Sequence, residues 1–119
     1  MGKNATATSS NVSRAEAIAK LNDHLRKTGQ GGSIVITSNL RRVSDFDPAA
    51  LASALANYEG FDHGNDPFGE HDFGALTLWG SNILWKIDYY DRDLKHGSDE
   101  PADPGVTARV LTVMLASDW

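Results

Sequence analysis

The sequence predicts a small α+β domain in which an antiparallel sheet of about three strands packs against helices, in the order α-β-α-β-β-α. Three observations predict it. An apolar stripe with helical spacing follows Ser13, an Asp-Pro pair opens a second stripe at Asp47, and two strand-like runs flank Gly80-Ser81.

The first helix is expected to begin at "SRAE", because Ser13 and Glu16 have the spacing of a capping box. Apolar residues then recur at helical period: Ala15, Ile18, Leu21 and Leu25. The glycines of "TGQGG" should end the helix. Residues 1–12 are rich in Ser, Thr, Asn and Ala, which predicts a flexible tail ahead of a single domain over residues 13–119.

Next, "SIVIT" at residues 33–37 is short, β-branched and bounded by Gly32 and Asn39, which predicts a buried strand. The following "DPAALASALANY" has Asp47 as a helix N-cap and Pro48 at the first helical position. A second helix over residues 47–58 is therefore expected.

The runs "ALTLW" and "ILWKIDYY" flank "GSN", so we expect a β-hairpin that turns at Gly80-Ser81. An Asp-Pro pair, Asp103 and Pro104, again opens the last segment, residues 104–117, which is apolar nearly all round and so favours a buried helix. Its β-branched residues leave a strand as the alternative.

Composition limits the function. The chain has no cysteine, which excludes disulfides and thiolate sites, and no apolar run is long enough to span a bilayer. The cytoplasm is the expected location, and no membrane contact is expected. Residues 1–60 carry seven Lys or Arg against five acids, and residues 61–119 carry four against eleven. An acidic half of this kind argues against direct nucleic-acid binding and suits a basic protein partner.

Four phrases in the second half are long and specific: "NDPFGEHDFG", "WKIDYYDRDL", "GSDEPADP" and "RVLTVMLA". On these phrases the chain resembles a small bacterial family catalogued as a domain of unknown function, DUF 3768, over residues 14–119. The resemblance implies an origin in alphaproteobacterial genomes, plasmids and other mobile elements, but no known activity. Relatives often have histidine where this chain has Phe68, so any ligand or base at that position is lost here.

The stretch "GFDHGNDPFGEHDFG", residues 60–74, holds two histidines, four carboxylates and four glycines. Imidazole with carboxylate suits a divalent metal ion such as Zn, Mn or Fe. The metal alternative takes these ligands: His63, Asp66, Glu70, His71 and Asp72. The other interpretation is a structural loop in which Asp62, Asn65 and Asp66 cap turns, and the absence of an H-E-x-x-H spacing favours it.

In "WKIDYYDRD", strand alternation puts Lys86, Asp88 and Tyr90 on one face and Trp85, Ile87 and Tyr89 on the core face. Lys86 and Asp88 could pair, or their face could join the acidic loop in a pocket. The catalytic alternative is then His71, Glu70 and Asp88. Neither a phosphate-binding G-x-x-x-x-G-K loop nor a G-x-S-x-G elbow is present.

Beyond the hairpin, an acidic ribbon continues through Asp91, Asp93, Asp99, Glu100 and Asp103. It lacks the pattern of a calcium-binding hand, so it is either a solubilising loop or a partner surface. The basic residues Arg26, Lys27, Arg41 and Arg42 come without an aromatic platform or nucleic-acid-binding motif.

Our leading hypothesis is a small acidic protein-binding module from a mobile element, rather than an enzyme. Because mobile elements carry anti-restriction and anti-CRISPR inhibitors, the partner class includes nucleic-acid-binding host defence complexes. The expected contact residues are Asp91, Asp93, Asp99, Glu100 and the aromatic anchor Trp79, with exposed Trp119 as a further anchor. The alternatives are a metal-dependent hydrolase built on loop 62–72 and self-assembly through a sheet edge.

Overall fold

The computed structural model describes residues 13–119, and the tail predicted for residues 1–12 lies outside the described residues. Helix α2 (Arg14–Thr28) begins with the predicted capping box, in which Ser13 and Glu16 bond each other's backbone amides at 3.0 Å. It ends at Gly29, whose φ of 77° is the left-handed conformation that glycine adopts without strain.

Strand β1 (Ser33–Ile36) leads into a short helix, α3 (Ser38–Arg41), which the sequence analysis did not predict. Thr37 caps α3 through its side-chain oxygen. Helix α4 (Pro48–Ala56) starts as predicted, with the Asp47 carboxylate accepting the Ala49 amide at 3.0 Å. Leu51 and Leu55 are its buried residues.

The remaining elements are β2 (Phe73–Leu78), β3 (Ser81–Tyr90), β4 (Ala108–Leu115) and the 3-10 turn η1 (Ala116–Asp118). They form a four-stranded sheet in the order β1-β4-β3-β2. The helix favoured for residues 104–117 is therefore wrong, and the strand alternative holds. β4 lies between β1 and β3 and is a nearly continuous apolar run. Periodicity in a single sequence does not distinguish such a run from a buried helix.

The sheet is mixed rather than antiparallel, because β1 runs parallel to β4 while β2, β3 and β4 are antiparallel neighbours. The strand predicted at residues 33–37 is present as β1, but the prediction that it is buried is wrong. β1 lies at the edge of the sheet, where Ile34 is 41% exposed and Val35 is 46% exposed. A β-branched run predicts a strand, but it does not predict whether the strand lies at the edge or in the centre of the sheet.

The hairpin turns one residue earlier than predicted. Trp79 and Gly80 are its central residues, with left-handed φ values of 55° and 72°, between the paired residues Leu78 and Ser81. A two-residue turn of this kind needs positive φ at both positions, so glycine takes the second place. Trp79 takes the first, and its ring packs edge-on against Phe46 with the centroids 5.6 Å apart.

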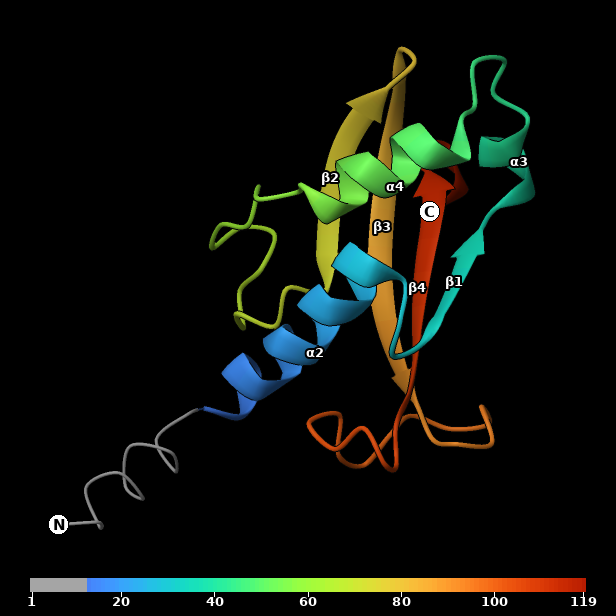
Figure 1. Cartoon of the computed structure of the whole chain (residues 1–119). Coiled ribbons are helices and arrows are strands. Elements are labelled where there is room, and N and C mark those ends of the chain that lie inside the picture. The colour runs from blue at the N-terminus through green and yellow to red at the C-terminus, as the bar shows by residue number, and fades with distance from the viewer. Residues whose placement is uncertain (1–12) are drawn as a thin grey trace, which may run out of the picture.

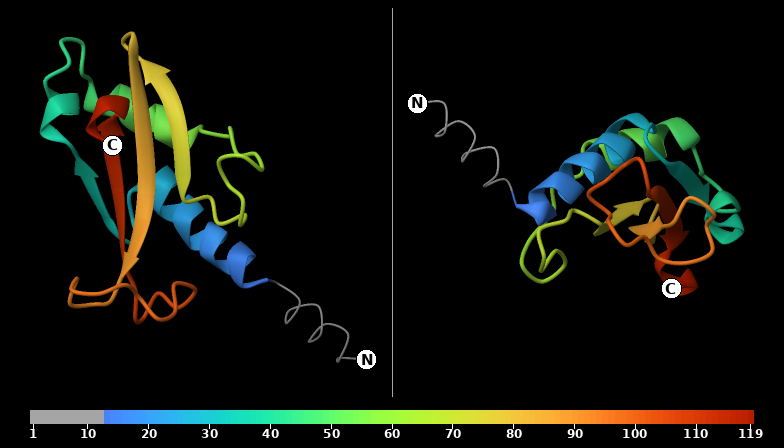
Figure 2. Two further views of the ribbon diagram at one scale, coloured as in Figure 1. Left: turned by 180° about the vertical axis from the view of Figure 1, so that it is seen from behind. Right: turned by 90° about the horizontal axis from the view of Figure 1, so that it is seen from below.

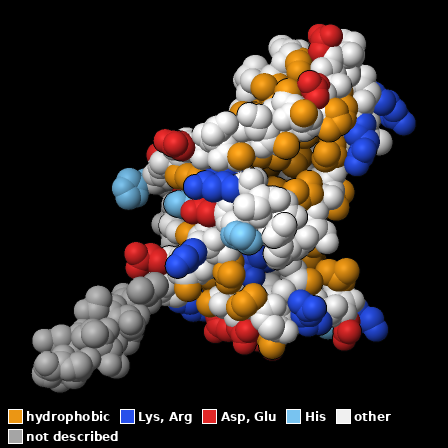
Figure 3. Space-filling model, viewed as in Figure 1, with side chains coloured by type: hydrophobic (Ala, Val, Ile, Leu, Met, Phe, Trp, Pro, Cys, Tyr) orange, Lys and Arg blue, Asp and Glu red, His pale blue; other side chains and the backbone are white. Residues whose placement is uncertain are grey.

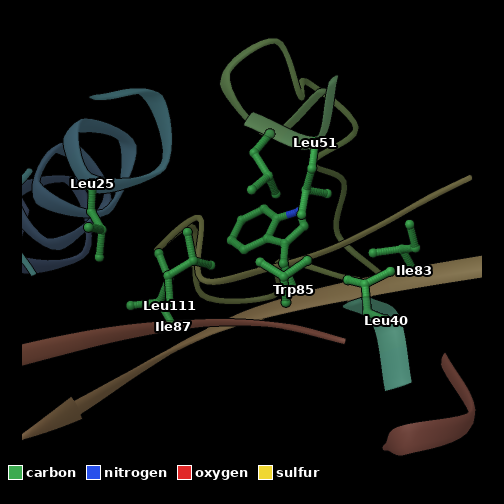
Figure 4. Packing of buried hydrophobic residues seen from close by; sticks show 9 residues of the cluster. Leu25, Leu40, Leu51, Ile83, Trp85, Ile87 and Leu111 are labelled. Carbon is green, nitrogen blue, oxygen red and sulfur yellow. The ribbon is translucent and has the colours of Figure 1, made fainter. Parts of the chain in front are cut away.

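Helices α2 and α4 both lie on one face of the sheet, which makes a two-layer α+β architecture (Figures 1 and 2). Trp85 is the centre of the core between the layers, fully buried among leucines and isoleucines from both (Figure 4). Gly74 lies against it, since a Cβ there would sit 2.5 Å from the indole nitrogen. No helix in the described part of the chain is long and apolar enough to cross a membrane.

Candidate functional site

The loop that joins α4 to β2 begins with two interlocked polar side chains. One carboxylate oxygen of Asp62 accepts the backbone amides of Gly64 and Asn65, at 2.8 and 3.0 Å. Asn65 accepts the Asp62 amide and donates to the Gly60 carbonyl at 2.8 Å. These bonds confirm the turn-capping interpretation of Asp62 and Asn65, and they leave His63 exposed at the surface.

His71 fastens the end of this loop to α2. Its Nδ1 lies 2.9 Å from an Asp23 carboxylate oxygen, and its Nε2 lies 3.7 Å from Asp66. The ring stacks on Phe61 with a centroid distance of 4.0 Å, and the backbone amide donates to Asp66. A φ of 56° makes His71 a non-glycine residue held in a strained conformation.

Arg26 completes this contact from beneath. Its guanidinium is buried, donates to Asp23 at 2.7 Å and to the Leu55 carbonyl at 3.0 Å, and lies over the Phe61 ring. Desolvation raises the pKa of Asp23, but hydrogen bonds from Arg26 and His71 outweigh it and leave the pKa below its ordinary value. Asp23 is therefore held as a carboxylate. Arg26 is thus unavailable to the basic patch considered from the sequence.

A second polar network lies deeper, between α2, β3 and β4. Asn22 is fully buried and donates to the Glu70 carbonyl at 2.9 Å and to the Tyr89 hydroxyl at 2.8 Å. Tyr89 donates to the Glu70 carboxylate, and the buried Arg109 donates to the Asn22 side-chain oxygen, both at 2.9 Å. Each buried polar group of the network has a partner, which makes the arrangement rigid.

Burial acts on both ionisable groups of the strands in this network. Burial raises the pKa of Tyr89, and burial lowers the pKa of Arg109 from its ordinary value. Arg109 also donates to the Pro101 carbonyl, which joins this network to the loop between β3 and β4.

The structure does not assemble the predicted metal ligands. Within residues 13–119, no group of three or more histidines and carboxylates is arranged to hold a metal ion. Asp66 and His71 contact each other, and the exposed His63 lines the same surface hollow without being arranged with them as a ligand set. The metal alternative stays an untested prediction without support from this geometry.

The three residues of the catalytic alternative each belong to a different set of contacts. Glu70 accepts the Tyr89 hydroxyl, both His71 ring nitrogens face carboxylates, and Asp88 pairs with Lys86 at 2.7 Å on the uncovered sheet face. The Lys86–Asp88 pairing considered from the sequence is thereby confirmed. The shallow hollow beside His71 is lined by His63 and Asp66 as well, but Glu70 and Asp88 of the catalytic alternative do not line it.

Carboxylates nonetheless gather around Asp72. Burial raises the pKa of Asp72, and the negative charges of Glu70, Asp66 and Asp88 raise it further. The backbone carbonyl of Asp72 accepts the Ile87 amide at 2.8 Å, so this crowding is built into the start of β2.

The predicted partner residues lie mainly in loop 91–107, which connects β3 to β4 below the sheet in Figure 1. Asp91 accepts the Lys95 amide at 3.0 Å, and bonds from backbone amides lower its pKa. The Glu100 carboxylate pairs with Arg14 at 2.9 Å. Asp93 and Asp99 are exposed.

Trp79 does not belong to the same surface. It lies in the β2–β3 turn, at the opposite end of β3 from Asp91 (Figure 1). The ten residues of β3 separate the two ends by about 30 Å at roughly 3.3 Å per residue. Trp79 is also half-buried, whereas Trp119 is 71% exposed and packs edge-on against Phe73.

A family model described as "Protein of unknown function (DUF3768)" matches residues 36–118. The chain belongs to this family. The DUF3768 match starts at the end of β1 and reaches η1, so it includes both acidic loops and the whole β2–β4 sheet. Neither the curated proteins nor the solved structures contain a match to the chain.

Five residues that organise this region were not predicted as site residues from the sequence, where Tyr89 was placed only on the core face and Arg26 only among the basic residues: Asn22, Asp23, Arg26, Tyr89 and Arg109. Two of them had a visible signal. Asn22 and Arg26 interrupt the apolar stripe of Ile18 and Leu25 at helical spacing, and polar residues on a buried face need partners from elsewhere. Arg109 alternates with Leu111 and Val113, but only an assignment as a strand makes that alternation apparent.

Proposed function

We propose that this DUF3768 protein is a non-enzymatic binding module that docks loop 91–107 onto a basic protein surface. One observation carries the proposal: the loop is long and exposed, yet its own hydrogen bonds hold it in shape. Loops of this length without regular structure are usually disordered or functional. A frame of internal bonds argues against disorder.

The frame has two parts. In the first, Tyr90 and Gly97 form a β-bridge, and the Asp91 amide donates to the His96 carbonyl at 2.8 Å. In the second, the hydroxyls of Ser98 and Thr107 meet at 2.6 Å, and Thr107 donates to the Glu100 carbonyl. The carboxylates of Asp93 and Asp99 take no part in either, which leaves them for a partner. A loop ordered before binding loses less conformational entropy on binding.

Leu94 supports the same surface. It is 59% exposed and has a φ of 59°, a conformation that costs a non-glycine residue about 1 kcal/mol or more. An exposed, strained leucine between Asp93 and Lys95, in a loop with five carboxylates and two Lys or Arg, is well placed as an apolar anchor. The complementary partner has an apolar depression ringed by Lys or Arg.

Basic surfaces of this kind hold phosphates in nucleic-acid-binding proteins. The resemblance to proteins of mobile elements suggests a host defence complex, so our specific proposal is an anti-restriction or anti-CRISPR inhibitor that competes with nucleic acid. Charge pairing at the rim would speed association and make it sensitive to salt.

The test compares wild type with D93K/D99K and with D45K/E59K. The second pair is exposed and changes the net charge equally, but it lies outside the loop. Purified restriction enzymes and CRISPR effector nucleases are assayed for DNA cleavage with each protein added. We expect wild type and D45K/E59K to inhibit one of these nucleases equally, and D93K/D99K to inhibit at least tenfold less. Equal inhibition by all three proteins would contradict the acidic-loop surface.

Leu94→Gly separates binding from folding. Glycine relieves the positive φ, so the thermal midpoint should stay the same or rise while inhibition weakens. Unchanged inhibition by this variant would remove Leu94 from the interface.

A further inference from the structure

Strand β1 leaves one side of its backbone unpaired by the rest of the sheet. The Thr37 amide donates to the Val113 carbonyl at 3.0 Å, so by alternation the amide groups of Ser33 and Val35 also face β4. The N–H and C=O groups of Ile34 and Ile36 then point outward. Among residues 13–119, β4 is the one strand that pairs with β1.

Apolar side chains accompany this edge on both faces of the sheet. Ile34 stands opposite Leu111 on the helix-covered face, and Val35 stands opposite Thr112 on the uncovered face. Beside Ile34 is a slot of about 250 Å³ whose apolar walls come from Ile36, Leu51 and Leu55. That volume accommodates the side chain of an added residue rather than a large ligand.

Positive charge accompanies the edge from end to end. Arg41 donates through Nε to the outward-facing Ile36 carbonyl at 3.1 Å, and Lys27 lines the apolar slot. Arg92 lines a second hollow, of about 300 Å³, together with Gly31 and Ser33 at the start of β1. Figure 3 shows Lys and Arg side chains gathered beside α3 and again at the foot of the same edge of the molecule. In a chain of net charge −5, three cations thus lie along this one edge: Lys27, Arg41 and Arg92.

From this geometry we infer that β1 binds an extended acidic segment of a partner protein as a fifth strand. The outward groups of Ile34 and Ile36 supply main-chain hydrogen bonds, and the slot receives one aliphatic side chain of the segment. Carboxylates at its two ends meet Arg41 and Arg92. Arg41 turns from the Ile36 carbonyl to a carboxylate, which it binds as a planar two-pronged donor.

Charge also decides against a second copy of this chain as the occupant. Antiparallel pairing of two β1 strands about a twofold axis through Ile34 would place Arg41 of one protomer near Gly31 of its partner. Arg92 lines that end of the strand in each protomer. Like charges would meet at both ends, and cations on a sheet edge are a known means of preventing self-pairing.

The test uses a fluorescein-labelled peptide in which Glu and Val alternate, followed by fluorescence anisotropy. We expect saturable binding to wild type and no binding of the matched Lys-Val peptide. R41Q/R92Q should weaken the Glu-Val peptide at least tenfold. R14Q/K20Q, which removes two exposed cations from α2, should change its affinity by less than twofold. If R41Q/R92Q and R14Q/K20Q weakened peptide binding equally, net charge alone would explain the loss, and the inference would be overturned.

Two further measurements locate the contact. Ile34→Pro deletes an outward N–H without removing a bond to β4, so binding should be lost while Ile34→Ala retains part of it. In wild type, hydrogen exchange at the Ile34 and Ile36 amides should slow at least tenfold when the peptide is added. Exchange unchanged at both amides would overturn strand addition even if Ile34→Pro failed to fold.

Sedimentation of the chain alone distinguishes self-association. A dimer that R41Q/R92Q strengthens would replace the acidic partner with a second copy. The inference is independent of the proposed function, because D93K/D99K should still bind the Glu-Val peptide. The two surfaces adjoin, because Leu94 and Arg92 line the same hollow. They are distinguished by opposite outcomes: D93K/D99K should lose nuclease inhibition and keep the peptide, whereas Ile34→Pro should lose the peptide and keep inhibition.

Discussion

Loops 57–72 and 91–107 each carry five carboxylates, but the end of the first loop is held against α2 while the carboxylates of Asp93 and Asp99 in the second face solvent. In loop 57–72, Asp66 is 8% exposed, and His71 joins the loop to Asp23 of α2. In loop 91–107, Asp93 and Asp99 face solvent, while bonds within the loop and from Arg14 and Arg109 hold its backbone and Glu100. The number of carboxylates in a loop therefore does not determine whether they are exposed to a binding partner. Asn22 and Asp23 of α2 hold Glu70 and His71, and we call loop 57–72 the inward loop for this reason.

The largest expected effect comes from the residue that holds the inward loop most firmly. Asn22→Ala removes the partner of the Glu70 carbonyl, the Tyr89 hydroxyl and the Arg109 guanidinium at once. Buried groups left unsatisfied cost about 1–3 kcal/mol each before relaxation, so we expect a loss of about 2–4 kcal/mol in the free energy of unfolding. Urea denaturation measures it. Asn82→Ala, on the exposed part of β3, is the control and should cost less than about 0.5 kcal/mol.

The opposite outcome would contradict the role given to α2. A cost of Asn22→Ala no larger than the control's would mean that the inward loop is held by its own turns. The two loops would then differ only in the direction they face.

The next effect concerns the two histidines of the inward loop. His71→Ala removes the contact with Asp23 and the stack on Phe61, for an expected loss of about 1–2 kcal/mol. His63→Ala removes an exposed side chain and should cost less than about 0.5 kcal/mol. His71→Gly should be less destabilised than His71→Ala, because glycine adopts the positive φ of 56° without strain. Thermal or urea unfolding of the three variants checks the order.

Adding Zn, Mn, Mg or Ca singly to chelated wild type sharpens the same experiment. A metal that binds the native state raises the unfolding midpoint by mass action. A saturable rise that His71→Ala abolishes would revive the hydrolase alternative. Equal behaviour of His63→Ala and His71→Ala without metal would contradict the structural role given to His71.

Local signals predicted the local parts of this fold. The capping box at Ser13 and the Asp47-Pro48 start are set by side chains that bond backbone amides within a few residues, so a single sequence contains the whole interaction. The hairpin was located within one residue for the same reason. Strand β4 was not, because its partner β1 lies more than seventy residues earlier and its apolar run fits a buried helix equally well.

The candidate site divides in the same way. Asp62 and Asn65 were correctly interpreted as turn caps, because they bond their own neighbours. The partners of His71 and Glu70 come from α2 and β3, and no spacing within "GFDHGNDPFGEHDFG" identifies them. Which acidic loop faces outward therefore depends on long-range pairing that the sequence pattern did not determine.

The smallest effect is expected at Asp72, which lies close to the negative charges of three other carboxylates. Because burial and the charges of Glu70, Asp66 and Asp88 raise the pKa of Asp72, its ionised form destabilises the folded chain at neutral pH. Asp72→Asn should therefore stabilise the protein by up to about 1 kcal/mol at pH 7, the scale of partly exposed charge interactions. The gain should shrink as the pH falls through the raised folded pKa, and vanish once the carboxyl is protonated in both states.

Asp23 should show the opposite sign, because its pKa is lowered and the stability it contributes above its ordinary pKa is lost on acidification. Thermal midpoints of Asp72→Asn, Asp23→Asn and wild type between pH 3 and pH 7 measure both trends, with exposed Asp99→Asn as the outward-loop control. Asp99→Asn should follow wild type across the range. If Asp72→Asn did the same, the carboxylates of the inward loop would be as well solvated as those of the outward loop, and the distinction between the two loops would be one of shape alone.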